Sequence, residues 1–248
     1  MENTLPDFSG RTVAIRALVG SHNYNLNTPS SDRDFKFFVI PTFDDLYSGK
    51  HFASANTSEN FDYSCHDIRR LGELVWKANI NFIEVLFSTD ILHAHDLEWL
   101  DDDAICNQFA TMNIPSFTNA CFGMHKQKMG NLYKGTDTTK DLVEKFGYDT
   151  KEATHALRML YVMDRFTETR NMKEAIWFED DNPMRSTLLK LKAGEYSESE
   201  FRNLVQVWFQ IRADHVRKIL DSYKPMVFLK GILDKEIKEF IRKRIIQK

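Results

Sequence analysis

Cysteine is scarce in this sequence: Cys65, Cys106 and Cys121 stand far apart among 248 residues. A disulfide framework needs paired cysteines and a zinc site needs closely spaced ligands, so neither is predicted. Isolated cysteines favour reduced, buried thiols and a cytoplasmic protein. Long apolar runs are missing too, since none reaches the roughly 20 residues that span a bilayer. Residues 1–7 are polar and acidic, which is not typical of a signal peptide. We therefore expect no membrane association.

A strong charge of either sign is also absent. The chain has 33 Lys and Arg against 36 Asp and Glu, a formal net charge of −3. No overall field draws it to nucleic acid or to an anionic membrane, and this balance disfavours a long nucleic-acid footprint. By contrast, 19 Phe and a hydrophobic share of 42% predict a dense aromatic core. The length predicts one large domain or two small ones.

The first hundred residues contain three short runs of β-branched and apolar side chains, which predict strands. They are residues 12–19, 33–40 and 61–66. Helices are predicted at residues 42–47 and 68–78. Thr42 and Asp67 precede them as N-caps. Residues 49–60 are polar and predict no strong element, and residues 93–103 predict an acidic, solvated stretch.

From residue 104 onward the pattern is helical, because apolar residues recur every three or four positions. Helices are predicted at residues 119–133 and 149–170, after Pro183, from Ser197 to Tyr223, and from Gly231 to Arg244. Strand signals are confined to the early part of the chain, which favours an α+β fold. We expect a small mixed-sheet domain in residues 1–103 and an all-helical domain in residues 104–248.

Residues 19–35 combine features that suit a phosphate and a cation. An apolar run ends in Gly20-Ser21, where the lack of a side chain on glycine lets a phosphate approach the backbone. After ten more residues, Asp32 and Asp34 come just before the next apolar run. Carboxylates two residues apart on a strand share one face and cannot be buried unpaired. Their hard oxygen atoms suit Mg²⁺, which takes further ligands from water and phosphate.

The pattern of Gly20-Ser21, ten residues and Asp32-x-Asp34 resembles the nucleotidyltransferase superfamily of the DNA polymerase β type. The resemblance implies that residues 1–103 form the catalytic domain, with a third carboxylate on a neighbouring strand. Asp62 is the candidate for that carboxylate. Asp67 is the rival, but it directly precedes an amphipathic run, so an N-cap explains it better.

More of the chain is similar to one branch of that superfamily, the predicted nucleotidyltransferases found in phages and bacteria near RNA ligases. The matching segments are residues 20–34, 66–71, 79–86, 151–158 and 188–197. The first segment is specific, whereas each of the others is weak alone. The sequence departs from the pattern at His22-Asn23, where the family often has a basic residue.

The resemblance implies a two-metal site for nucleotidyl transfer. Asp32 and Asp34 would hold two Mg²⁺ ions, with Mn²⁺ as the alternative metal, and Asp62 would hold one of the two. Gly20 and Ser21 would contact the β- and γ-phosphates of a nucleoside triphosphate. The expected nucleotide-binding residues are Gly20, Ser21, Ser31, Lys151, His155 and Arg158.

Lys151, His155 and Arg158 have spacings of four and three, which place them on one face of a helix. Three potentially cationic groups in one stripe favour an anion between them, such as a triphosphate. A solvated helix face explains the same spacing equally well. His125, Lys126 and Lys128 extend the stripe if the preceding helix lies alongside. Glu84 lies in an apolar segment, and we expect it to pair with a basic residue such as Arg69, outside the catalytic set.

These observations predict an enzyme that moves a nucleoside monophosphate from a nucleoside triphosphate (NTP) to a hydroxyl or phosphate and releases pyrophosphate. The acceptor is open between an RNA or tRNA end, a small molecule and a protein side chain. The alternative is a non-catalytic module that binds a nucleotide or RNA beside an RNA-repair system. An intact set of three carboxylates disfavours that alternative, because clustered like charges are costly to keep.

Overall fold

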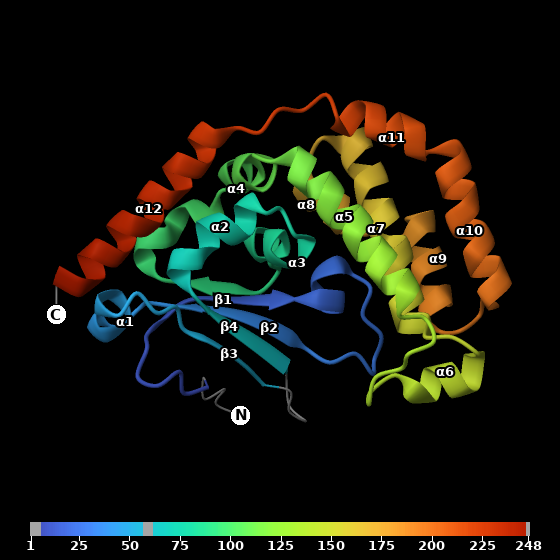
Figure 1. The fold of residues 1–248 in the computed structure, drawn as a ribbon, viewed down its shortest axis with the longest axis horizontal. Helices are drawn as coiled ribbons and strands as arrows, with labels where there is room; N and C mark the ends of the chain where they lie inside the picture. The colour runs from blue at the N-terminus through green and yellow to red at the C-terminus, as the bar shows by residue number, and fades with distance from the viewer. Residues whose placement is uncertain (1–5, 57–61, 247–248) are drawn as a thin grey trace.

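The structure, a computed structural model, describes residues 6–56 and 62–246. Figure 1 shows a sheet half that contains both ends of the described chain and a helical half beside it. The sheet has five strands in the order β3-β4-β2-β1-β5. Their bounds are β1 Val13–Val19, β2 Asp34–Val39, β3 Ala53–Asn56, β4 Asp62–Asp67 and β5 Ile91–His93. β2 and β4 are parallel, and the other neighbours are antiparallel, so the sheet is mixed.

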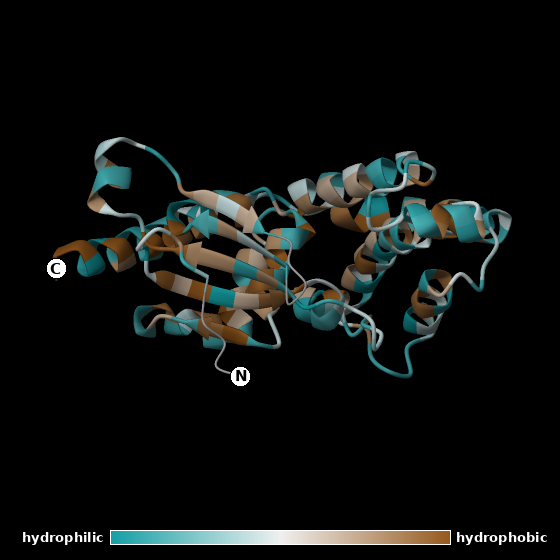
Figure 2. Cartoon of the chain, turned by 90° about the horizontal axis from the view of Figure 1, so that it is seen from below, coloured by the Kyte–Doolittle hydropathy of each residue, from teal (hydrophilic) through white to brown (hydrophobic). Residues whose placement is uncertain are grey.

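Short helices cover one face of this sheet. They are α2 (Leu71–Trp76), α3 (Ile80–Ile83) and α4 (Asp103–Ala110), with the 3-10 turns η2 (Ile68–Arg70), η3 (Glu84–Phe87) and η4 (His95–Asp101). Figure 2 looks onto the opposite face, where the strands lie in front of the helices. There Phe8 joins the strand residues Phe37, Val39 and Cys65 in a small second core. α1 (Phe43–Tyr47) follows β2 and begins with the predicted Thr42 cap, completed as a capping box by Asp45.

The helical half is built around two long helices that pack on each other, α5 (Ile114–Gly130) and α7 (Thr150–Thr169). The remaining helices of this half are α6 (Lys140–Phe146), α8 (Met172–Ile176), α9 (Pro183–Lys192), α10 (Glu198–Ile211) and α11 (Ala213–Leu220). One continuous apolar cluster runs from the sheet into these helices. No helix of the described chain is both long enough and apolar enough to cross a membrane.

The α+β class is confirmed, and several boundaries are corrected. The predicted irregular stretch at 49–60 contains β3, and the acidic stretch at 93–103 begins at the end of β5. Each of these short strands is stabilised by hydrogen bonds to a neighbouring strand. Its own amino-acid composition therefore gives little indication of a strand. The first residue of the predicted strand 61–66 lies outside the described residues. The predicted helix 197–223 divides at Arg212, which bonds to Asp164.

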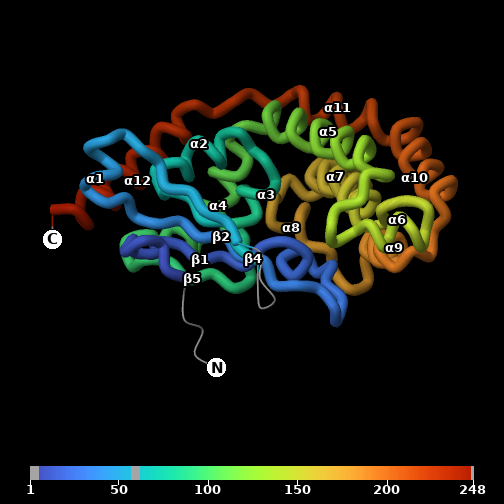
Figure 3. Tube along the Cα trace, turned by 60° about the horizontal axis from the view of Figure 1, so that its bottom comes forward, coloured from blue at the N-terminus to red at the C-terminus, as the bar shows by residue number. Residues whose placement is uncertain are grey.

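The last helix, α12 (Val227–Ile246), starts four residues earlier than predicted and returns to the sheet half. It packs against α2, η2 and α4. Figures 1 and 3 both show it running from α11 back to the neighbourhood of α1 and α2. The division after residue 103 therefore remains a prediction, and the C-terminal helix adds to the packing of the N-terminal half.

Candidate active site

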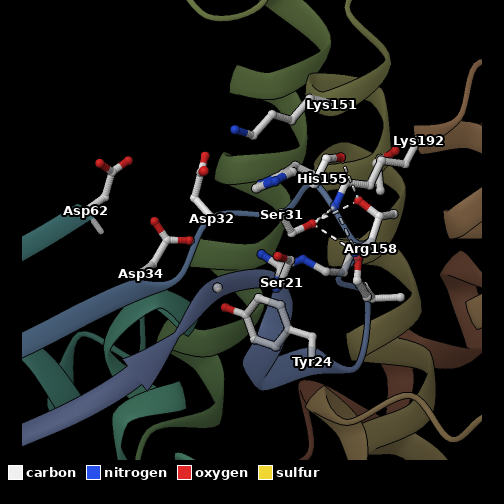
Figure 4. A pocket seen from close by; sticks show the side chains of 15 residues that line it. Ser21, Tyr24, Ser31, Asp32, Asp34, Asp62, Lys151, His155, Arg158 and Lys192 are labelled. Carbon is white, nitrogen blue, oxygen red and sulfur yellow. Dashed lines mark hydrogen bonds between the residues drawn. The ribbon is translucent and has the colours of Figure 1, made fainter. Parts of the chain in front are cut away.

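A cleft lies where β1 ends and β2 and β4 begin, and α7 and α9 supply its other side. Its lining residues are Gly20, Ser21, Tyr24, Leu26, Thr28, Ser30, Ser31, Asp32, Asp34, Asp62, Lys151, Thr154, His155, Arg158 and Lys192. All nine predicted site residues are among them. In Figure 4, three carboxylates lie on one side of the cleft and the basic side chains on the other. We call Asp32, Asp34 and Asp62 the acidic side, and Lys151, Arg158 and Lys192 the basic side.

Gly20 sits at the turn from β1 into the 3-10 helix η1 (Gly20–Tyr24), with φ at +74°. A side chain is disfavoured at this φ, and a Cβ there would collide with the carboxylate of Asp34. The Gly20 N–H donates to Glu84 Oε2 over 2.8 Å. A phosphate contact with this N–H, as the sequence predicts, therefore requires the bond to Glu84 to break.

The acidic side is assembled by strand pairing. Asp34 and Asp62 are direct partners at the starts of the parallel strands β2 and β4, and Asp32 precedes Asp34 by two residues. The peptide N–H of Asp62 also donates to the carbonyl of Arg33, which ties the start of β4 to β2. Partial burial, and next the charge of Asp62, raise the pKa of Asp34. The ionised form of Asp34 is thus disfavoured until a cation approaches.

Of the two candidates for the third carboxylate, only Asp62 lies in the cleft. Asp67 stands five residues further along β4, on the opposite face, and is completely buried. It accepts the Arg69 N–H and pairs with the Arg69 guanidinium, so the predicted N-cap role of Asp67 is confirmed.

The acidic side has the donor chemistry of a magnesium site: hard carboxylate oxygens, carried by neighbouring strands, with Asp34 destabilised by a like charge. Among the described residues, no three His, Cys, Asp or Glu side chains are already gathered tightly enough to coordinate one ion. The chemical identity of the ligands fits Mg²⁺, and coordination by all three requires their side chains to move closer together.

The basic side comes from two helices. Lys151, His155 and Arg158 lie along α7 as predicted, but burial, and next Arg158, lower the pKa of His155 well below its ordinary value, which disfavours its charged form. Arg158 is 3% exposed, and its guanidinium carbon lies 3.8 Å from the centre of the Tyr24 ring. Its Nε and Nη1 have no hydrogen-bond partner among the described residues. A buried arginine with unused donors is suited to an anion.

Lys192, at the end of α9, completes the basic side and was missed as a site residue. Its Nζ donates to the Ser31 hydroxyl over 3.0 Å and to the Leu26 carbonyl over 3.2 Å. Burial, and next Lys151, lower the pKa of Lys192. The sequence signal for a functional role of Lys192 is its position within residues 188–197, a segment that matches the family but that predicts no particular site residue. α9 also holds the loop before Asp32, because Arg185 donates to the carbonyl of Asn25.

The predicted extension of the stripe by α5 is not seen. His125 bonds to the carbonyl of Ala156, and Lys128 pairs with Glu152. Neither of them, nor Lys126, lines the cleft that the described residues form.

The expected pairing of Glu84 with Arg69 is wrong. Glu84 is 2% exposed and lies beneath the cleft, where it accepts the Gly20 N–H. Burial raises the pKa of Glu84, whereas Lys36 and then hydrogen bonding to Tyr24 oppose that shift. A charged residue in an apolar segment was the available signal, but its partners are Tyr24 and the Gly20 N–H, which is 64 residues away.

A small mixed sheet with facing carboxylates at the starts of two strands, a Gly-Ser turn beside them and a helical half opposite is the architecture of a polymerase β-type nucleotidyltransferase. The chain belongs to the RNA repair pathway DNA polymerase beta family, RlaP, whose family model matches residues 7–221. α12 lies beyond that match. No curated protein matches the chain.

Proposed function

We propose that this protein is a metal-dependent nucleotidyltransferase that moves a nucleoside monophosphate from an NTP to a hydroxyl or phosphate acceptor. One observation carries the proposal: Asp34 and Asp62 lie side by side, in register, in a cleft whose opposite side holds Lys151, Arg158 and Lys192. Such a cleft suits a substrate that brings both a cation and a run of phosphates. The family membership supports the same class of reaction.

Asp32 and Asp34 are proposed to hold two Mg²⁺ ions, and Asp62 to hold one of them. Ions held by these carboxylates would supply charge neutralisation for the phosphoryl oxygens and a lowered pKa for an attacking hydroxyl. The basic side binds the β- and γ-phosphates, with Ser21 and Ser31 as hydroxyl donors. The buried, unused donors of Arg158 support this assignment of the basic side.

The transfer forms one bond and breaks one. An acceptor oxygen attacks the α-phosphorus, and the bond from that phosphorus to the oxygen bridging the β-phosphorus breaks. Pyrophosphate leaves along the basic side. When the acceptor is a hydroxyl, its proton passes to Asp62, the carboxylate that lies farthest from the basic side in Figure 4. The acceptor is an RNA or tRNA end, a small molecule or a protein, and acceptor profiling decides among them.

The test is incubation of the protein and Mg²⁺ with α-labelled ATP, CTP, GTP or UTP together with total RNA and cell lysate. We expect label in one acceptor fraction, release of pyrophosphate, and loss of both in the double variant Asp32→Asn, Asp34→Asn. Asp44→Asn, an exposed acid at the start of α1, is the matched control and should retain transfer. Transfer that survives in the double variant contradicts the proposal, and metal-independent binding of NTP without transfer supports a binding module instead.

A further inference from the structure

The cleft does not end at the carboxylates. It continues into a second hollow that shares Gly20, Tyr24, Asp34, Asp62, His155 and Arg158 with the first. Beyond these shared residues the hollow follows β4 and its neighbours. We call its distinctive part the strand groove, defined by Lys36 on β2, Ala55 on β3, Ser64 on β4 and Asn81 on α3.

Strand register explains why this groove is open. Lys36 is the direct partner of Ser64, and Ser64 is the direct partner of Ala55. All three therefore share the face that carries Asp34 and Asp62, two residues away. Ala55 and Ser64 are small and leave space above the strands. Because β3 is the outer strand and Ala55 is exposed, the groove reaches solvent at this edge of the sheet.

The charge of the groove differs from that of the basic side. Apart from the shared residues, Lys36 is the one basic side chain and Glu84 the one acidic side chain that line this hollow among the described residues. Glu84 is buried and accepts the Gly20 N–H, so Lys36 is the charged group that a ligand in the groove can reach. The Lys36 ammonium lies 5.4 Å from the centre of the Phe82 ring. The basic side offers three cations, which suits a triphosphate. A single lysine beside a serine and an asparagine suits one phosphate with polar groups around it.

In-line displacement at phosphorus requires the NTP and the acceptor to approach from opposite directions. The attacking and leaving oxygens lie roughly in line, on opposite sides of the transferred group. If the proposed function holds, pyrophosphate leaves along the basic side, so the acceptor approaches from the strand groove. We propose that the strand groove binds the end of an RNA strand, with its terminal ribose hydroxyl at Asp62 and its nearest phosphodiester at Lys36.

Two observations favour an RNA end over a protein acceptor. A protein nucleophile brings no obligatory anion, whereas Lys36 offers a cation two positions along β2 from Asp34. The groove opens at the edge of the sheet, which gives the rest of a polymer a way out. The small net charge of the chain fits a contact with few phosphates.

A rival explanation assigns Lys36 only to compensation of buried acids, since its charge lowers the pKa of Glu84 and of Asp34. The two explanations differ in what they predict. If Lys36 only compensates buried acids, its loss should change the stability of the protein and the binding of NTP, because the carboxylates it stabilises serve the NTP. A phosphate contact acts on RNA binding and leaves NTP binding unchanged.

The test compares Lys36→Met with Lys218→Met, which removes the same charge from an exposed position on α11. The probe is a single-stranded oligoribonucleotide of about twelve nucleotides, labelled at its 5′ end and carrying a 3′ hydroxyl. Fluorescence anisotropy reports RNA binding, and calorimetry reports ATP binding. For Lys36→Met we expect RNA binding weakened about tenfold, as for one lost charged hydrogen bond. The slope of log K against log salt should become shallower by about 0.7, as for one lost phosphate contact on a single strand.

ATP affinity of Lys36→Met should stay within about twofold of the parent, since the basic side is intact. Unchanged RNA affinity in Lys36→Met overturns the inference, and so does an equal loss of RNA and ATP affinity, which is the result expected from charge compensation. A second variant, Ser64→Leu, fills the groove without changing charge and should weaken RNA binding while ATP still binds. RNA affinity retained in Ser64→Leu also overturns the inference.

Failure of the inference and failure of the proposed function give different results. If label goes only to protein, the transfer stands and the RNA assignment of the groove is wrong. If no acceptor is ever labelled, the proposed function fails, while the dependence of RNA binding on Lys36 and Ser64 still decides whether the groove binds RNA.

Discussion

The two sides of the cleft are built in different ways. The acidic side stands on adjacent strands, where backbone pairing sets Asp34 opposite Asp62. The basic side consists of long side chains on α7 and α9, and its parts are distant in sequence. Lys192 reaches Ser31 across 161 residues. A rigid register thus fixes the acids, and packing of helices fixes the cations.

The two sides also differ in the electrostatic surroundings of their charged groups. Asp34 faces a like charge, and its ionised form is disfavoured in the protein alone. Arg158 is buried against Tyr24 with two donors unused. The environment of Asp34 therefore favours the approach of a cation, and that of Arg158 favours an anion. The substrate that we propose, a metal-bound NTP, would bring a cation to the acidic side and an anion to the basic side.

Removing one acid should have the largest effect. We expect Asp34→Asn to lower transfer on the order of 10³-fold or more, beyond the 10- to 100-fold loss typical of a changed supporting residue. The same change should raise the melting temperature by roughly 1–3 °C at neutral pH. The sign follows from the raised pKa: the ionised carboxylate destabilises the fold at high pH, and this cost disappears as pH falls below the ordinary range of an aspartate.

Transfer assays and thermal melting without metal measure the two effects. A lower melting temperature for Asp34→Asn would show that the acidic side is not strained, and the contrast between the two sides would then fail.

Disturbing the turn beside the acids should have the next largest effect. Gly20→Ala places a Cβ against the Asp34 carboxylate at a positive φ. We expect transfer to fall about 10²-fold through displacement of Asp34, and stability to fall by about 1–2 kcal/mol. Gly123→Ala on α5 is the control, because a Cβ there meets nothing within 4 Å. It should leave transfer unchanged and add about 0.5–1 kcal/mol of stability. Urea unfolding and transfer assays check both variants.

Loss of one cation should have a smaller effect. Lys192→Met should weaken ATP binding roughly tenfold, because a charged hydrogen bond to phosphate is lost. Lys190→Met, an exposed change on the same helix, should not. Burial lowers the pKa of Lys192, so ATP affinity should decline as pH rises through a value below that of an ordinary lysine. Lys192→Arg should abolish that decline, because arginine stays charged. Calorimetric titrations from neutral to alkaline pH measure this, and an identical decline in Lys192→Arg would assign it to another group.

His155 should give the smallest change. Because burial lowers the pKa of His155 well below its ordinary value, we expect His155→Gln to remove no positive charge from the basic side at neutral pH. We expect ATP affinity to change by no more than about threefold, the scale of one neutral hydrogen bond. Binding curves of the parent protein between pH 6 and 8 should show no inflection from His155. An inflection that disappears in His155→Gln would make the histidine a third cation of α7, as its spacing alone suggested.

The parts of the fold and site that the sequence predicts are local or periodic. Gly20-Ser21 and Asp32-x-Asp34 are recognisable because a turn and a two-residue repeat are properties of neighbouring residues. The stripe of Lys151, His155 and Arg158 follows from the helical period. Thr42 and Asp67 cap the elements they precede. The same local signals supported the α+β class.

Contacts between distant segments decided the rest. β3 and β5 exist through pairing with β4 and β1. Glu84 meets Gly20, and Lys192 meets Ser31, only because helices and strands pack in this arrangement. The lowered pKa of His155 is a consequence of burial, which no spacing reveals. Sequence by itself predicted Asp32 and Asp34 as a pair on one face, since strand alternation is local, and the pairing of β2 with β4 added Asp62 to them. Tertiary structure decided what faces those residues, because desolvation and long-range pairing depend on the whole packed chain.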